Sequence, residues 1–349
     1  MSLEFITDLE RWQQVVDRLP EFCGKVYYNA CYHQACEING DGRPAALYFN
    51  EDQTIIFYPF LIRPVPAILG FSGSFDMQTA YGYSGPAIFG GTPPTVARFA
   101  EMQARWAEDA GIIAEFVRFN PFFDMNTLSH IFKPELNRKT VSIELDHDFS
   151  VMLRQSSGPR QRNYRKALRA GLSYVALPDG KEIAKIYRKA MQRIGADEYY
   201  YFSDRYFTAL QDMPPESRFF AGIKDSDGKL IAGGIFLQDS VAAHYHLGAS
   251  VAEARELQPD AFMLFEAARI AAANDKKLLH LGGGLSLADD DGLYRFKSGF
   301  SQKRQDFYIA RKIHQQELYD KISKKWQNLT GRKPHILLHY HEGLEHADV

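Results

Sequence analysis

The stretch 218–281 constrains the fold more than any other part of the chain. Three strand-like apolar runs follow one another there, and a short turn ending in Gly228 joins the first two. An amphipathic helix comes next, with Pro259 just before its start, and one more strand follows it. The predicted elements are strands at 218–224, 230–238 and 241–249, a helix at 260–274 and a strand at 278–281. This order predicts an α/β domain built on a mixed sheet.

The first half of the chain repeats this order more weakly. Strands are predicted at 45–49 and 54–62, a helix at 94–110 and a strand at 112–119. A chain of 349 residues is long enough for two domains. The repeated order resembles the core of GNAT acyltransferase domains. We therefore predict an α/β (α+β) fold of two tandem GNAT-like domains with mixed sheets, comprising residues 1–148 and 149–317.

Charge and composition narrow the functional classes. The formal net charge of −2 gives no overall electrostatic attraction for nucleic acid, so we expect no DNA partner. No apolar run reaches the roughly 18 residues that span a bilayer, and the first residues do not read as a signal peptide. Cys23, Cys31 and Cys36 are an odd, low count whose spacing fits no zinc motif. We expect a cytoplasmic protein without a metal site or a permanently bound cofactor.

Four motifs resemble Fem-type peptidoglycan-bridge aminoacyltransferases. They are the basic helix 160–171, the glycine loop 281–284 with the Phe-Lys segment 293–300, the run from Asp76 to Pro86 with Tyr81 and Tyr83, and the segment 115–121. The resemblance implies transfer of an acyl or aminoacyl group to an amine, with a peptidoglycan precursor as one candidate acceptor. It also implies a donor that is aminoacyl-tRNA or acyl-CoA, and a segment 318–349 that packs back on the first domain. The coiled-coil arm of tRNA-binding relatives is missing, because the helix from 181 ends before Gly195.

The basic helix is a candidate anion site. Arg160 and Tyr164 share a helix face by their i, i+4 spacing, and a guanidinium can grip phosphate in two places. The resemblance implies that Arg160 and Tyr164 bind a pyrophosphate-bearing substrate such as a UDP-linked muropeptide. The alternative is a solvated basic face. By the same resemblance, Asp76, Tyr81 and Tyr83 supply the far wall of the substrate cleft.

Lys297 is the candidate catalytic cation. Acyl transfer passes through a tetrahedral oxyanion, and a fixed positive charge beside it lowers the barrier. The lysine of the family's Phe-Lys motif lies at this point, and Phe296 packs beside it to exclude water. The alternative is a surface lysine, and Lys303 and Arg304 are close enough in sequence to bind phosphate instead.

The strand 241–249 carries a second catalytic candidate. Alternation places His244 and His246 on one face and Tyr245 on the other. A histidine there is a candidate general base, whereas the family lines the acceptor cleft with tyrosines. Tyr245 is therefore a substrate-binding candidate, and half-buried structural histidines remain the alternative.

The donor and the functional class stay open at this point. Ordinary GNAT domains carry a Gln or Arg with spaced glycines where their acyl-CoA helix begins. Here Gln258-Pro259-Asp260 stands in that place, which weakens an acyl-CoA donor. One rival is an acyl-CoA-dependent N-acyltransferase acting on a small amine or sugar. The other is a catalytically silent protein that binds an anion in the same cleft.

Overall fold

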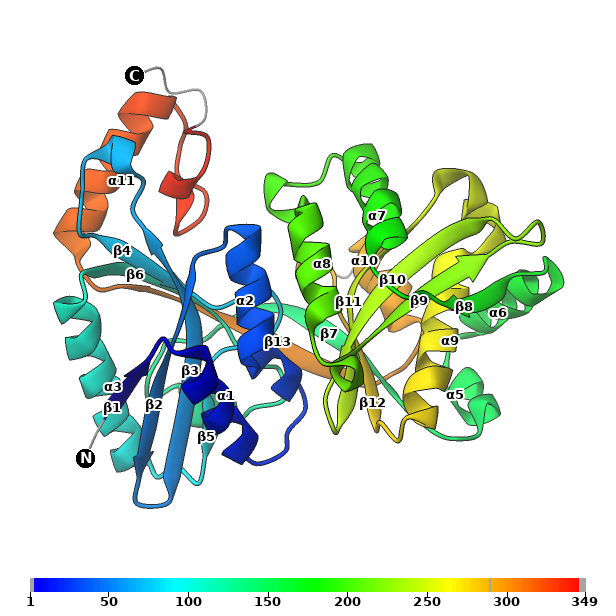
Figure 1. Cartoon of the computed structure of the whole chain (residues 1–349), viewed down its shortest axis with the longest axis horizontal. Helices are drawn as coiled ribbons and strands as arrows, with labels where there is room; N and C mark the ends of the chain where they lie inside the picture. The colour runs from blue at the N-terminus through cyan, green and yellow to red at the C-terminus, as the bar shows by residue number, and fades with distance from the viewer. Residues whose placement is uncertain (1–2, 289, 345–349) are drawn as a thin grey trace. The chain divides into compact units, whose positions relative to one another are not determined.

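The computed structural model describes residues 3–288 and 290–344 (Figure 1). The chain forms two compact units, and neither is continuous in sequence. The first comprises Met1–Pro20, Tyr27–Leu136 and Tyr308–Val349; the second comprises Glu21–Val26 and Asn137–Phe307. The first boundary lies at residue 137 rather than near 149, because the strand Glu135–Glu144 pairs with the strand Leu278–Gly283 of the second unit.

The sheet of the first unit has the strand order β1-β2-β3-β4-β6-β13, and β5 pairs with β3. Only β4 and β6 are parallel to each other. The strands are β1 (Leu3–Ile6), β2 (Arg43–Glu51), β3 (Thr54–Pro64), β4 (Phe75–Gln78), β5 (Ala87–Phe89), β6 (Ile112–Arg118) and β13 (Arg304–Ile313), which runs out of the second unit into the first. The helices are α1 (Leu9–Arg18), α2 (Ala30–Asn39), α3 (Pro93–Asp109), α4 (Met125–Leu128) and α11 (Gln316–Thr330).

The apolar periodicity of 8–19 predicts a helix with Asp8 as its cap, and α1 begins there. Asp8 is the N-cap, and its carboxylate accepts a hydrogen bond of 2.7 Å from the amide of Arg11. The apolar stripe of α1 buries Trp12, Val15 and Val16. The periodicity that predicted the helix is therefore also the face that packs on the unit.

Two apolar clusters hold the first unit together. One is rich in aromatic rings, with Phe49, Phe60 and Phe99 fully buried between the sheet and α3. The other joins Trp326 and Tyr340 of the C-terminal segment to residues of β6 and of the loop before β4. The C-terminal segment thus lies on the first unit, as the motif resemblance implies.

The sheet of the second unit has the strand order β7-β12-β11-β10-β9-β8. Only β11 and β12 are parallel to each other. The strands are β7 (Glu135–Glu144), β8 (Ser173–Ala176), β9 (Arg218–Lys224), β10 (Leu230–Gln238), β11 (Ala242–Ser250) and β12 (Leu278–Gly283). The helices are α5 (Phe149–Gln155), α6 (Gly158–Arg169), α7 (Lys181–Ile194), α8 (Asp204–Asp212), α9 (Pro259–Ala273) and α10 (Gly292–Ser298).

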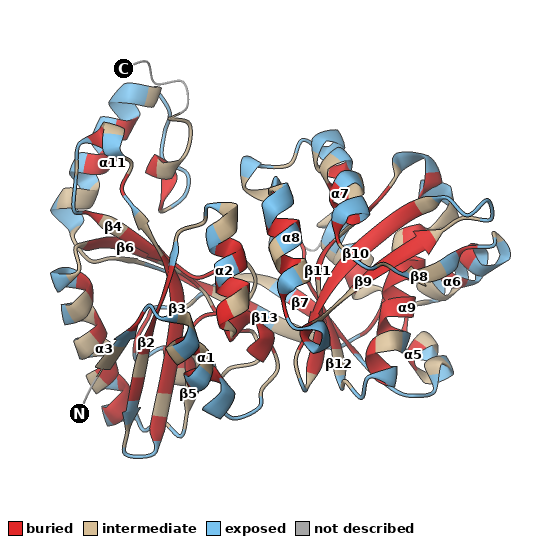
Figure 2. Ribbon diagram, in the orientation of Figure 1, coloured by how far each residue is buried: buried red, intermediate tan, exposed pale blue. Residues whose placement is uncertain are grey.

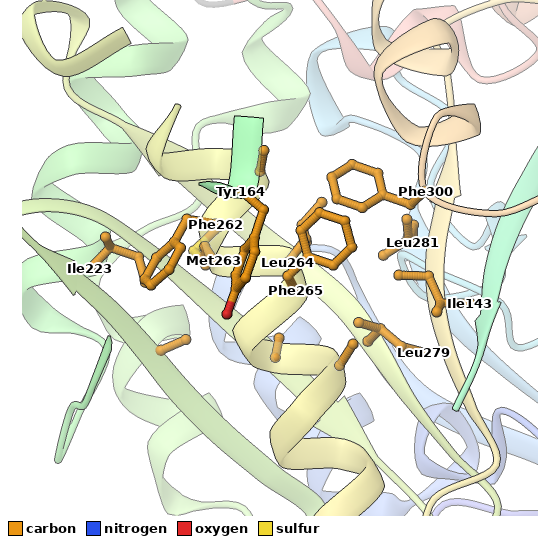
Figure 3. Packing of buried hydrophobic residues seen from close by; sticks show 14 of the residues in the cluster. Ile143, Tyr164, Ile223, Phe262, Met263, Leu264, Phe265, Leu279, Leu281 and Phe300 are labelled. Atoms are coloured by element: carbon orange, nitrogen blue, oxygen red, sulfur yellow. The ribbon is translucent and has the colours of Figure 1, made fainter. Parts of the chain in front are cut away.

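Helix α9 is the centre of the second unit's core. It is buried nearly all round, and Phe262 and Phe265 project from it into an aromatic cluster (Figure 3). Strands β9 and β10 are mostly buried, whereas the helices around them keep exposed faces (Figure 2). The core therefore fixes the position of β11 and β12, the two strands on either side of α9 in the chain.

The parallel strands β11 and β12 pair only at their beginnings. Their partners are Ala242 with Leu278, Ala243 with Leu279, and His244 with His280. Beyond this last pair the two strands part, although β11 continues to Ser250 and β12 to Gly283. Gly282 has a φ of +72° at a register shift of β12, a conformation that favours glycine. The parting of these strands creates the place where α10 approaches the sheet.

Across residues 3–288 and 290–344, no helix combines the length and apolar character that a bilayer crossing requires.

Candidate active site in the second unit

Lys297 lies in α10 at the parting of β11 and β12. Its Nζ donates a hydrogen bond of 2.8 Å to the carbonyl of Gly283, at the end of β12. The same Nζ lies 5.8 Å from the ring centroid of Tyr245 on β11. Lys297 is only 8% exposed. A buried ammonium group therefore touches both of the strands that separate here.

Burial lowers the pKa of Lys297 to about 7. The positive charge of Arg138 adds to this effect, and the negative charge of Asp291 opposes it. An ordinary lysine would stay protonated at neutral pH, but this one changes its charge there. A strongly shifted pKa beside a gap between strands is typical of a functional group.

The glycine loop before α10 is closed by Asp291. The carboxylate of this N-cap residue accepts hydrogen bonds from the amides of Leu285 (2.6 Å), Ser286 (2.9 Å) and Tyr294 (2.8 Å). A Cβ on Gly284 would lie 2.4 Å from the Asp291 carboxylate. The loop needs glycine because the protein's own atoms crowd it, which explains the glycines without any ligand.

Arg138 also holds this loop. It donates a hydrogen bond of 2.6 Å to the carbonyl of Gly284. The neighbouring Gly283 is also closely packed, because a Cβ there would lie 2.7 Å from the carbonyl of Lys139. The sequence motifs include neither Arg138 nor Asp291. An Asp three residues before Tyr294 at the start of a short helix is an N-cap signal that could have identified Asp291.

Arg160 lies against α10. Its guanidinium carbon is 4.4 Å from the ring centroid of Phe296 and 5.4 Å from that of Phe300. Its Nε donates to the carbonyl of Phe296 at 3.2 Å. Burial lowers the pKa of Arg160, since its environment solvates the charge less well than water does. The structure thus brings Arg160 against Phe296, the residue next to Lys297, although 136 positions separate Arg160 from Phe296 in the sequence.

Tyr164 occupies a different environment from Arg160. Its ring stacks on Phe262 with centroids 5.4 Å apart and meets Phe265 edge-on at 5.2 Å, inside the core (Figure 3). Its hydroxyl donates to the carboxylate of Glu266 at 2.9 Å. These contacts account fully for a tyrosine at this position, and the proposed site does not include it.

The two histidines of β11 are buried within the second unit. His244 Nε2 lies 3.4 Å from the Asp239 carboxylate, and its ring meets that of His280 edge-on at 5.6 Å. His246 Nε2 is hydrogen-bonded to the hydroxyl of Tyr206 at 2.8 Å. Burial lowers the pKa of His246 to about 3, with the neighbouring His244 adding to the effect. Tyr245, on the other face of the strand, is the residue that lies beneath Lys297 Nζ.

Lys303 and Arg304 already have protein partners. Lys303 forms an ion pair of 2.6 Å with Glu144. Arg304 donates to the carbonyls of Ser301 (2.6 Å) and Ser298 (3.1 Å), so it braces the end of α10. The alternative that these two residues hold phosphate finds no support in their contacts.

The remaining candidates, Asp76, Tyr81 and Tyr83, lie in the first unit. Asp76 is buried in β4, and its carboxylate accepts hydrogen bonds from the Tyr340 hydroxyl (2.6 Å) and His341 Nε2 (2.7 Å). The carbonyl of Tyr81 accepts from the Tyr32 hydroxyl.

Tyr83 packs edge-on against Tyr27, with the ring centroids 5.6 Å apart.

Within the described part of the chain, no group of three or more His, Cys, Asp or Glu residues is arranged to hold a metal ion.

Solved structures share this fold. FemX is 14% identical, with a TM-score of 0.66 over 91% of this chain and 99% of its own. L-PGS from Bacillus licheniformis is 12% identical, with a TM-score of 0.57 over 94% and 98%. The C-terminal domain of a putative lysylphosphatidylglycerol synthetase from Agrobacterium fabrum is 13% identical, with a TM-score of 0.55 over 87% and 91%.

No family model matches the sequence, and a search of the curated proteins finds no match. The structural likenesses confirm the predicted fold of two tandem GNAT-like domains and, at the level of the fold, the resemblance to Fem-type proteins.

Proposed function

We propose that this chain is a transferase that moves an acyl or aminoacyl group from an activated donor to an amine, with Lys297 as its catalytic residue. The observation that carries the proposal is a buried lysine at the parting of two parallel strands, with a pKa of about 7. A cation is costly to bury, so its presence here calls for a functional explanation.

The reaction can be written with the groups at hand. The amine nitrogen attacks the donor carbonyl, and the negative charge collects on the carbonyl oxygen. The ammonium group of Lys297 stabilises that oxyanion, held in place by the Gly283 carbonyl. The intermediate collapses when the bond to the donor's oxygen or sulfur breaks, and the amine proton passes to that leaving atom. The rings of Tyr245, beneath Lys297 Nζ, and of Phe296, against Arg160, keep water away from the two charges.

Arg160 serves as the anchor for an anionic substrate. Its guanidinium is half-buried and stacked on Phe296, and Phe296 precedes the catalytic lysine in α10. Such a group binds phosphate strongly because little rotamer freedom is lost on binding. This supports a phosphate-bearing acceptor, for which a UDP-linked muropeptide amine is the candidate from the motif resemblance.

The first prediction is that Lys297→Met lowers turnover on the order of a hundredfold to a thousandfold and leaves the Michaelis constant nearly unchanged. Methionine keeps much of the apolar length of lysine but removes the charge and the hydrogen bond to Gly283, and the oxyanion that the charge would stabilise exists only in the transition state. Steady-state kinetics with a working donor and acceptor, found by a thermal-shift screen, measure both constants.

Lys303→Met is the matched control, because it removes an exposed lysine of the same unit that pairs with Glu144. Its kinetics should equal those of the wild type. If the protonated lysine acts, activity of the wild type falls as the pH rises through about 7. A rise over the same range would assign Lys297 the role of a base, and unchanged turnover in Lys297→Met would remove it from the mechanism.

A further inference from the structure

The glycine loop beside Lys297 binds two cations through neighbouring carbonyls. The carbonyl of Gly283 accepts a hydrogen bond from Lys297 Nζ at 2.8 Å, and that of Gly284 accepts one from Arg138 Nη1 at 2.6 Å. Arg138 Nε also donates to the side-chain oxygen of Asn137 at 2.6 Å. These bonds hold the guanidinium from two sides, so Arg138 fixes the segment of backbone that binds the ammonium group of Lys297.

The same two glycines are packed between Arg138 and Asp291. A Cβ on Gly283 would lie 3.0 Å from Arg138 Cδ, and one on Gly284 would lie 2.4 Å from the Asp291 carboxylate. The Asp291 carboxylate bonds to backbone amides on both sides of the turn rather than to a cation. One glycine therefore lies against a positively charged side chain, and the next lies against a negatively charged one.

Arg138 and Asp291 act on the charge of Lys297 in opposite directions. A positive charge nearby disfavours the protonated ammonium group, and a negative charge favours it. Burial is the main cause of the lowered pKa of Lys297; Arg138 lowers it further, and Asp291 raises it. Charges act strongly on one another here, because Lys297 is buried and little water screens them.

Two further titratable groups lie near Lys297, one on each of the strands that separate. Tyr245 of β11 presents its ring to the ammonium group, with the centroid 5.8 Å from Nζ. Burial lowers the pKa of His280 of β12 well below its usual value, and the positive charges of His244 and Lys297 add to this effect. His280 is therefore uncharged at neutral pH, and among the described residues Arg138 and Asp291 are the charges that act on Lys297 there.

We infer that Arg138 and Asp291 are positioning residues for Lys297: they fix the Gly283 carbonyl that holds its ammonium group, and their opposite charges set the fraction of the lysine that carries a proton. The inference rests on the proposed function, in which the protonated lysine stabilises the oxyanion. Arg138 and Asp291 act on the reaction through Lys297 alone. Loss of Asp291 leaves more of the lysine neutral at pH 7, and loss of Arg138 leaves more of it protonated.

The protonation of Lys297 can be measured without any substrate. The test is a pH titration of the whole chain by NMR with isotope-labelled lysine, in which Lys297→Met identifies the signal of Lys297. Arg138→Gln should bind the proton of Lys297 about threefold to tenfold more tightly than the wild type, and Asp291→Asn about threefold to tenfold more weakly. A loop that was merely loosened would expose Lys297 to water and raise its pKa in both variants. A lower pKa in Asp291→Asn therefore separates the effect of charge from the effect of packing.

Three control variants accompany this titration. Arg138→Lys keeps the positive charge and should leave the proton affinity of Lys297 within about twofold of the wild type. Lys185→Gln and Glu182→Gln each remove one charge from an exposed ion pair of 2.6 Å on α7, and neither should change the titration of Lys297. The inference is overturned by an unchanged titration in Arg138→Gln, by a higher pKa in Asp291→Asn, or by shifts of equal size in the controls.

The pH dependence of turnover gives the second readout. Activity should persist to higher pH in Arg138→Gln and fall at lower pH in Asp291→Asn, with the Michaelis constant nearly unchanged in both. If the titrations shift as expected but Lys297→Met keeps full turnover, the inference about charge stands and the proposed function fails. If Lys297→Met loses turnover but neither variant shifts the titration, the proposed function stands and the positioning role fails.

Discussion

The burial of Lys297 lowers the free energy of unfolding of the chain at neutral pH. In the unfolded chain its pKa returns to the ordinary value near 10.5, whereas burial lowers it to about 7 in the folded chain. Between these two values the unfolded chain binds a proton that the folded chain lacks. The free energy of unfolding therefore rises with pH across this window and is lowest below pH 7. Conflict between stability and activity is a common property of catalytic groups.

The same residue gives a stability prediction. Lys297→Met should raise the free energy of unfolding at pH 7 by about 1–3 kcal/mol, since relief of the buried charge outweighs the lost hydrogen bond to Gly283. The gain should shrink as the pH rises from 7 and vanish above about 10.5, where the wild-type lysine is neutral in both states. Denaturant unfolding at several pH values measures it. A variant that is less stable at pH 7 would show that the hydrogen bond dominates.

At the scale of single residues, the sequence predicted part of the candidate site. Lys297, Phe296 and Arg160 come from local motifs, and the structure brings them together. Helical spacing places Arg160, Tyr164 and Leu168 on one face, but Tyr164 is in the core and Leu168 is half-exposed. Spacing fixes which residues share a face, but it does not determine what packs on that face.

At the scale of elements, the C-terminal segment is held by one buried carboxylate. Asp76 in β4 accepts hydrogen bonds from Tyr340 and His341. Trp326 of α11 is fully buried in the same apolar cluster as Tyr340. The partners of Asp76 lie 264 and 265 positions away in the sequence. No local pattern could have identified His341 as the partner of Asp76.

Removal of the Tyr340 hydroxyl tests how strongly this segment is anchored. Tyr340→Phe should lower the free energy of unfolding by about 1–3 kcal/mol, because a buried carboxylate oxygen loses its hydroxyl donor. Tyr48→Phe is the control, since its hydroxyl bonds only in an exposed setting, and it should change stability by less than about 0.5 kcal/mol. Chemical denaturation compares the two, and equal effects would contradict the anchoring role.

Long periodic elements were predicted well and short ones were not. The helices α1, α3, α7 and α9 and the strands β2, β3, β6 and β9 to β11 lie close to their predicted positions. The glycine, serine and tyrosine content of 70–91 predicts a loop, but this stretch contains β4 and β5, which are too short to show alternation. The sequence also predicts a helix break at Gly158-Pro159, and the structure has it just before these residues, between Gln155 and Gly158. Proline needs no amide partner in a first turn, so Pro159 helps to begin α6.

At the scale of the molecule, each unit is assembled from segments that are separate in the sequence. The first unit takes β13 and α11 from the end of the chain, and Ala310 of β13 is buried in its core. The second unit takes only 21–26 from the beginning. Composition and element order predicted two units but assumed continuous ones, because pairing between distant strands leaves no local signal.

This arrangement predicts how fragments behave. A fragment 1–136 should not unfold cooperatively, because β6 loses its neighbour β13 and the C-terminal cluster is gone. A fragment 137–307 should retain a cooperative transition, since it keeps six paired strands and the α9 core. Thermal melts followed by circular dichroism compare them. A sharp transition in the fragment 1–136 would contradict the dependence on the C-terminal residues.

The interleaved chain also sets an order of events during synthesis. The ribosome makes most of the first unit before any of 137–307, yet the last strand and helix of that first unit are made only after 137–307. At about 5–20 residues per second, the early residues wait roughly 10–40 s for their missing partners. The second unit has all of its residues before then. The unit that is begun first is therefore the unit that is completed last, and until β13 and α11 are made it exposes the apolar surface that they cover in the folded chain.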